Sequence, residues 1–111
     1  METRIIMQDL RTMGVGCRYM GYNQVIKAVR MASLDQSRLQ SVKQGILQPL
    51  AEDESCDWRA VERNIRTVIH RAWNINRPYL SGLAGYPMNQ EPTVSEFVEI
   101  LSTHATSRHL S

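Results

Sequence analysis

The stretch PLAEDESCDWRAVERNIRTVIHRAW, residues 49–73, decides the fold of this chain. Its opening proline suits the first turn of a helix, so residues 49–53 are predicted to form a short helix. A polar turn over residues 54–57 follows, and Asp57 is a candidate N-cap for a longer helix over residues 58–73. A short helix, a turn of about four residues and a longer helix form the layout of a helix-turn-helix.

The long predicted helix has two chemically different faces. At about 100° per residue, one face is apolar and carries Val61, Ile65, Val68 and Ala72. The opposite face carries Arg59, Glu62, Arg63, Arg66 and His70. Arginine forks bond guanine edges or phosphate oxygens, and a glutamate can accept from cytosine N4. Because the second helix of a helix-turn-helix enters the major groove, this polar face is a candidate for reading double-stranded DNA.

The same polar face has a second interpretation, an ordinary solvated helix surface. Glu62 precedes Arg66 by four residues, which is the spacing of a weak surface ion pair. Three arginines with one glutamate and no lysine give a nucleic-acid partner about the same weight as simple solvation. The pattern alone leaves both interpretations open.

The first half of the chain shows three further helical patterns. Residues 3–13 form the first, and Gly14 is its expected C-cap. Apolar residues recur with helical spacing over residues 22–32 and again over residues 39–46, which predicts a second and a third helix.

The end of the chain is also predicted to be helical. The long helix should end over residues 74–77 at Pro78, followed by a short turn over residues 79–83. Thr93 and Glu96 form a capping box that opens a last helix, with a frayed tail expected from His104. The fold class is therefore all-α, a bundle of about six helices that contains a helix-turn-helix. Trp73 and Phe97 lie in register with inward faces and should be buried.

Composition limits the alternatives. A chain of 111 residues with 42% hydrophobic and 22% charged residues is expected to form one domain, residues 1–111. No apolar run approaches the roughly 18 residues that span a bilayer, and the start resembles no signal peptide, so we expect a cytoplasmic protein without a membrane partner. The net charge of +2 is too small to indicate nucleic acid by itself.

Other chemistries find little support in the sequence. His70, His104 and His109 are scattered, so no metal site is predicted. Cys17 and Cys56 are isolated thiols, and the acidic pair at residues 53 and 54 is expected to be solvated. The Gly14-Val15-Gly16 segment lacks the third glycine and the preceding strand of a phosphate loop. We therefore expect no cofactor and no enzymatic activity.

A series of short motifs, in this order and spacing, resembles the C-terminal effector domain of the stage zero sporulation protein A family. The resemblance runs from about Leu10 to the last helix. The motifs are Met13-Gly14-Val15, Gly21-Tyr22, Leu50-Ala51, Val61-Glu62-Arg63-x-Ile65-Arg66, Ala72-Trp73, Gly85-Tyr86 and Pro92-Thr93-x-Ser95-Glu96-Phe97.

The resemblance implies a bundle of six helices that binds a short DNA element through its helix-turn-helix. It implies binding as tandem copies or a homodimer and contact with the sigma subunit of RNA polymerase. By position, Glu62, Arg63 and Arg66 correspond to residues of the family's recognition helix. The chain is thus expected to be a sequence-specific transcription regulator.

The sequence departs from the family pattern at two positions. Ala60 stands where the family has a base-reading arginine, and Pro49 replaces a polar residue of the first motif helix. The 111 residues also include no phosphorylatable receiver, as expected of either an excised domain or a free-standing protein. Ala60 favours the alternative function, an interaction module that pairs with a full-length regulator or RNA polymerase without operator binding of its own.

Overall fold

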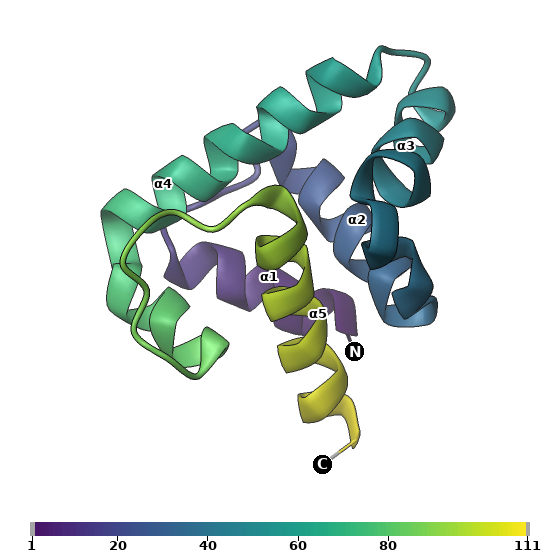
Figure 1. Cartoon of the computed structure of the whole chain (residues 1–111). Helices are drawn as coiled ribbons and strands as arrows, with labels where there is room; N and C mark the ends of the chain where they lie inside the picture. The colour runs from purple at the N-terminus through teal and green to yellow at the C-terminus, as the bar shows by residue number, and fades with distance from the viewer. Residues whose placement is uncertain (1, 111) are drawn as a thin grey trace.

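The computed structural model describes residues 2–110, with side chains described for residues 2–107. The described residues contain no strand, which confirms the all-α class. The 27-residue α4 crosses the molecule above α1 and α5, and α2 and α3 lie beside its first turns (Figure 1). The elements are α1 (Glu2–Thr12), α2 (Gly21–Leu34), the 3₁₀ helix η1 (Gln36–Ser41), the π-helical turn η2 (Lys43–Leu47), α3 (Gln48–Asp53), α4 (Trp58–Ala84) and α5 (Val94–Leu110).

Gly14 ends α1 as predicted. Its φ is +81°, and the N–H of Val15 donates to the Leu10 carbonyl at 2.8 Å, which closes a Schellman cap. A Cβ at Gly14 would lie 2.7 Å from Cγ2 of Ile75. Glycine therefore both permits the left-handed backbone and lets the α1–α2 loop pack against α4.

The predicted α-helix over residues 39–46 is wrong in detail, because this segment forms the 3₁₀ helix η1 and the π turn η2. Pro49 gives the physical reason, since it has no N–H to offer the Gly45 carbonyl and its ring crowds that carbonyl. The backbone widens, and the N–H of Gln48 donates to the Lys43 carbonyl five residues earlier. Arg38 donates from Nη1 to the freed Gly45 carbonyl at 2.6 Å.

The second half of α4 also corrects the sequence prediction. The helix breaks at Asn76, with φ −148° and ψ 63°, and continues as a helix to Ala84 where a turn over residues 79–83 was expected. Asn76 acts as a cap, because its Oδ1 accepts from the Tyr79 N–H at 3.3 Å. Its Nδ2 donates to the Thr12 carbonyl at 3.0 Å, which joins the break to the end of α1. Counted as two helices, α4 brings the α-helices of the described residues to six.

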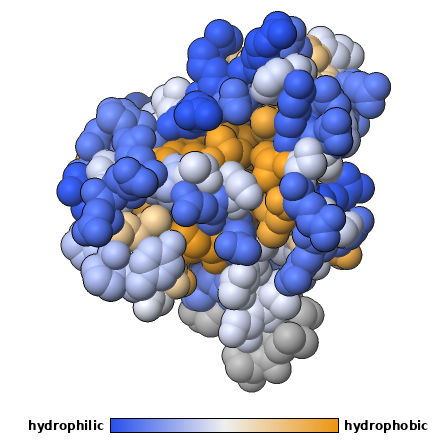
Figure 2. Space-filling model, in the orientation of Figure 1, coloured by the Kyte–Doolittle hydropathy of each residue, from blue (hydrophilic) through white to orange (hydrophobic). Residues whose placement is uncertain are grey.

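The core forms where α2 packs against α5, α4 and α1. Trp73 and Phe97 are 8% and 0% exposed, so their predicted burial is confirmed. Hydrophilic residues cover the edge along α4, and hydrophobic residues are visible in the recess below it (Figure 2). Among residues 2–110, no helix has the length and apolar character to cross a membrane.

Residues from His104 onward do not form the frayed tail that the sequence suggested, because α5 continues to Leu110. His104 is held by a buried carboxylate, with its Nδ1 2.7 Å from Oδ2 of Asp9. The hydroxyl of Tyr79 donates to the other oxygen of Asp9, which is only 2% exposed. This network joins α1, the second half of α4 and α5 around one carboxylate.

Candidate nucleic-acid interface

The turn between α3 and α4 is closed by its own backbone. The N–H of Cys56 donates to the Ala51 carbonyl at 2.9 Å, and the N–H of Ser55 donates to the Glu52 carbonyl at 3.2 Å. These two bonds form a Schellman cap, in which Ser55 takes the left-handed position with φ +55°. The cap fixes the angle at which the chain leaves α3 and enters α4.

Glu54 anchors this turn to α2, which corrects the expectation that the acidic pair is simply solvated. Gln24 donates from Nε2 to Oε1 of Glu54 at 2.8 Å, and the Lys27 ammonium lies 3.1 Å from Oε2. The hydrogen bond from Gln24 and, after it, the charge of Lys27 hold the pKa of Glu54 below its usual value, against the opposing effect of burial. Asp53 remains 72% exposed and lies 3.8 Å from Lys27.

The first turn of α4 presents Arg59 beside an aromatic ring. Asp57 caps the helix as predicted, because its Oδ1 accepts from the Arg59 N–H at 2.8 Å. The Arg59 guanidinium lies 5.4 Å from the centroid of the Trp58 ring, and Lys43 of η2 lies 4.6 Å from it. Trp58 thus contacts one cation from η2, which precedes α3, and one from α4.

The next two turns of α4 carry Glu62, Arg63 and Arg66. Glu62 and Arg66 form the predicted i,i+4 ion pair, with 3.6 Å between Oε2 and Nη2. Arg63 is exposed and forms no ion pair with any side chain of residues 2–107. At 1.5 Å per residue, Arg59 to Arg66 extend over about 10 Å of one helix face, a length that a major groove can receive.

His70 shares this face but lies one turn beyond Arg66, and other groups hold it. Its Nδ1 lies 2.5 Å from Oε1 of Glu91, and the Asn74 amide lies 3.0 Å from its Nε2. This arrangement fits an Nδ1–H that donates to the carboxylate and an Nε2 that accepts from the amide. The structure therefore brings four of the five predicted residues together and links the fifth to the loop before α5.

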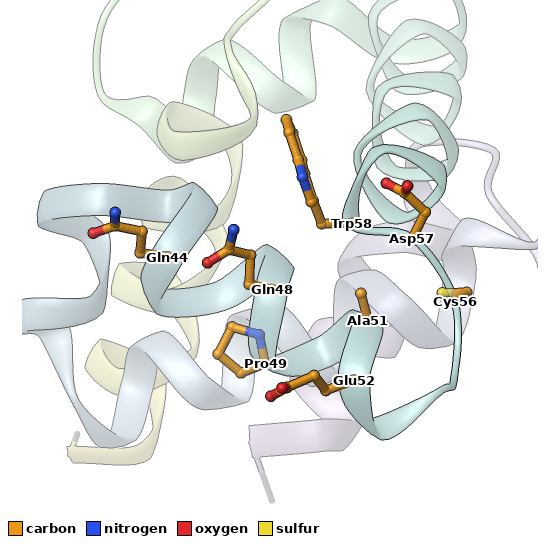
Figure 3. A pocket seen from close by; sticks show the side chains of 8 residues that line it. All are labelled: Gln44, Gln48, Pro49, Ala51, Glu52, Cys56, Asp57 and Trp58. Carbon is orange, nitrogen blue, oxygen red and sulfur yellow. The ribbon is translucent and has the colours of Figure 1, made fainter.

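A groove between the two helices of the motif was missed by the sequence analysis. Its volume is about 420 Å³, and Gln44, Gln48 and Trp58 line it. The two amides extend from η2 and α3 to the side on which the indole of Trp58 stands (Figure 3). Gln44 and Gln48 are four residues apart on an exposed face, and that spacing could have indicated them in the sequence.

Among the described residues, no group of three or more histidine, cysteine, aspartate or glutamate side chains could hold a metal ion. Cys17 and Cys56 are both free and exposed. His109 lies outside the residues whose side chains are described.

Comparison with protein families agrees with this geometry. Residues 6–105 match the family described as sporulation initiation factor Spo0A C terminal. The chain belongs to this family. The Spo0A C-terminal family is the DNA-binding effector domain of a sporulation regulator, which supports a DNA-binding regulator and gives no support for an enzyme.

Proposed function

We propose that this chain is a sequence-specific transcription regulator that inserts the first turns of α4 into the major groove of double-stranded DNA. Arg59, Glu62, Arg63 and Arg66 are the proposed contacts, and His70 has a smaller role because Glu91 engages it. The observation that carries the proposal is the exposed guanidinium face of α4, opposite a fully buried stripe, on a helix whose entry angle the capped turn fixes.

The ion pairs of the free protein fit this proposal. Arg59 lies 3.7 Å from Asp57, and Arg66 lies 3.6 Å from Glu62, at side-chain exposures of 74% and 66% for the two arginines. Exposed pairs of this kind contribute less than about 1 kcal/mol, so DNA phosphates can replace the carboxylates at little cost. Arg63 needs no such exchange and is therefore expected to contribute most to binding.

A titration of duplex DNA at several salt concentrations tests the proposal. Because neutralised phosphates release counterions, log K should fall linearly with log salt. Arg63→Ala should weaken binding. If Arg66 holds a phosphate, Arg66→Ala should flatten the slope by about one. Binding that does not depend on salt, or no binding at low ionic strength, would contradict the proposal.

Ala60 favours a second candidate function, an interaction module without operator binding of its own. Ala60 is partly buried, and it stands on the proposed recognition helix where the family has an arginine. Under this alternative the chain would pair with a full-length regulator or with the sigma subunit of RNA polymerase. Tandem binding or a homodimer on DNA belongs instead to the first proposal. Wild-type protein that binds no duplex in the titration above would favour the second candidate.

A further inference from the structure

A second basic surface lies beside α4, on the flank that faces the loop between α1 and α2. It consists of Arg71, of Tyr19, which Arg71 contacts, and of Arg18, the exposed residue before Tyr19 in the loop, and is called the loop-side surface below. Arg71 donates from Nε to the Gly14 carbonyl at 3.1 Å, and its guanidinium lies 5.9 Å from the centroid of the Tyr19 ring. Arg18 and Arg71 are exposed, and neither forms an ion pair with a side chain of residues 2–107.

The loop-side surface and the first helix of the motif lie on opposite flanks of α4. At about 100° per residue, Arg71 is roughly 120° around the axis from Arg59, and Trp58 is about 100° around in the other direction. Trp58 contacts Lys43 of η2, whereas Arg71 contacts the loop that follows α1. The proposed base-reading face therefore lies between two basic flanks.

The width of the major groove relates these two flanks to the phosphate backbones of DNA. A helix with its side chains is about 10 to 12 Å across, and the major groove is about 12 Å wide. A helix in the groove is thus bordered by a phosphate backbone on each side. With Nε bound to Gly14, the two Nη groups of Arg71 remain able to donate to phosphate oxygens.

We propose that the loop-side surface binds phosphates of the DNA strand that borders this flank of α4. Arg18 and Arg71 supply the charge, and Tyr19 is a positioning residue that holds the Arg71 guanidinium through its ring face. This inference rests on the proposed function, because it requires α4 to lie in the groove.

The test compares salt dependence and base preference for single variants. Arg18→Ala and Arg71→Ala should each weaken binding to every duplex and make the slope of log K against log salt less steep by about 0.9. The preference for the family's element over a scrambled duplex should not change, because phosphate contacts carry no sequence information. Tyr19→Leu should weaken binding, and Tyr19→Phe should retain it because the ring face remains.

Arg30→Ala is the matched control. Arg30 lines a groove between α2 and α3 with Leu34 and Asp53, and it does not line the groove that α3 shares with α4. Like Arg18, it is exposed and forms no ion pair with a side chain of residues 2–107. Its removal should leave the salt slope at the wild-type value.

The outcomes separate the two proposals. A wild-type protein that shows no salt-dependent binding overturns the proposed function. A wild-type slope that Arg63→Ala reduces, but that Arg18→Ala and Arg71→Ala both leave unchanged, overturns this inference alone. A change of base preference in either variant also overturns it, because the residue would then read bases. Arg18→Ala removes no side-chain hydrogen bond or ion pair with the described residues. This variant therefore tests the inference even if Arg71→Ala is unstable.

Discussion

Gly21 shows how a single residue sets the position of α4, the proposed recognition helix. A Cβ at this position would lie 2.3 Å from the carbonyl oxygen of Asn64 and 2.8 Å from Cγ2 of Val68. Backbone cannot yield as a side chain does, so Gly21→Ala should lower the free energy of unfolding by about 2 to 3 kcal/mol. Urea denaturation measures this change.

Gly82→Ala is the control for that substitution. Gly82 is helical and exposed, and a Cβ there would meet no atom within 4 Å. Alanine should stabilise this position by about 0.5 to 1 kcal/mol through its helix propensity. Equal effects of the two substitutions would show that Gly21 is not needed for the close approach of α2 to α4.

Ala60 raises the question whether Arg59 can replace the arginine that the family places at the neighbouring position. Arg59 lies about 100° around the helix from Ala60 and is held near Asp57 and the Trp58 ring. A bidentate arginine–guanine pair needs near-coplanar approach and contributes about 1 to 3 kcal/mol of discrimination, so a displaced guanidinium suits a phosphate better. The wild type should therefore prefer the family's element only weakly.

Ala60→Arg should then raise the preference for that element by roughly tenfold or more, with a modest rise in non-specific affinity. Competitive binding to the element and to a scrambled duplex, at one salt concentration, measures both quantities. A wild type that already discriminates strongly, with no gain from Ala60→Arg, would assign the reading to another residue.

At the scale of the elements, Glu54 makes the stability of the motif depend on pH. Because the folded pKa of Glu54 is lowered, its contribution is complete above the unfolded pKa of about 4.3 and is lost as pH falls through the folded value. Glu54→Gln should cost about 1 kcal/mol at pH 7. The difference in unfolding free energy between wild type and variant should disappear as the pH falls through the lowered folded pKa of Glu54.

Denaturation at a series of pH values checks this expectation, with Asp53→Asn as the control. Asp53 is 72% exposed and only 3.8 Å from the same lysine, so its substitution should change stability much less. If the difference in unfolding free energy between wild type and Glu54→Gln persists unchanged to pH 2, the carboxylate charge does not hold the turn.

The sequence predicted those elements whose signals are local. Gly14, Asp57 and the pair Thr93 and Glu96 act within one turn of the helix end that they cap, and the structure has all three caps where they were expected. The arginine face of α4 was predictable for the same reason, since periodicity fixes which residues share a face. The break at Asn76 falls within the helix end predicted over residues 74–77, and its cap to the Tyr79 N–H is local. Its hydrogen bond to Thr12, 64 residues away, had no signal in the sequence.

The interactions that the sequence analysis missed mostly join distant parts of the chain. Glu54 meets Gln24, and Arg71 meets Gly14, only because α2 and the α1–α2 loop pack beside the motif. The π turn before Pro49 is a local exception. Its cause is visible in the sequence, because Pro49 restricts the turn that precedes it as well as starting the helix that follows.

At the scale of the whole molecule, the carboxylate of Asp9 joins α1, the second half of α4 and α5, and none of the proposed DNA contacts takes part in this network. Asp9→Ala leaves the Tyr79 hydroxyl and Nδ1 of His104 without this acceptor. The variant loses two hydrogen bonds to this carboxylate, each contributing about 0.5 to 1.5 kcal/mol, so it should lose about 2 kcal/mol of unfolding free energy. Gln8→Ala, at the adjacent exposed position of α1, is the control for the change in helix propensity.

The motif itself is held by other contacts, including the Glu54 anchor and the packing of Gly21 against α4. Under conditions where Asp9→Ala remains folded, its salt slope on duplex DNA should therefore equal that of the wild type. Amide exchange should accelerate first in the part of α4 beyond Asn76 and in the last turns of α5, because Tyr79 and His104 lie there. Faster exchange in the turn between α3 and α4, or a reduced salt slope, would instead show that this network supports the proposed DNA-binding face.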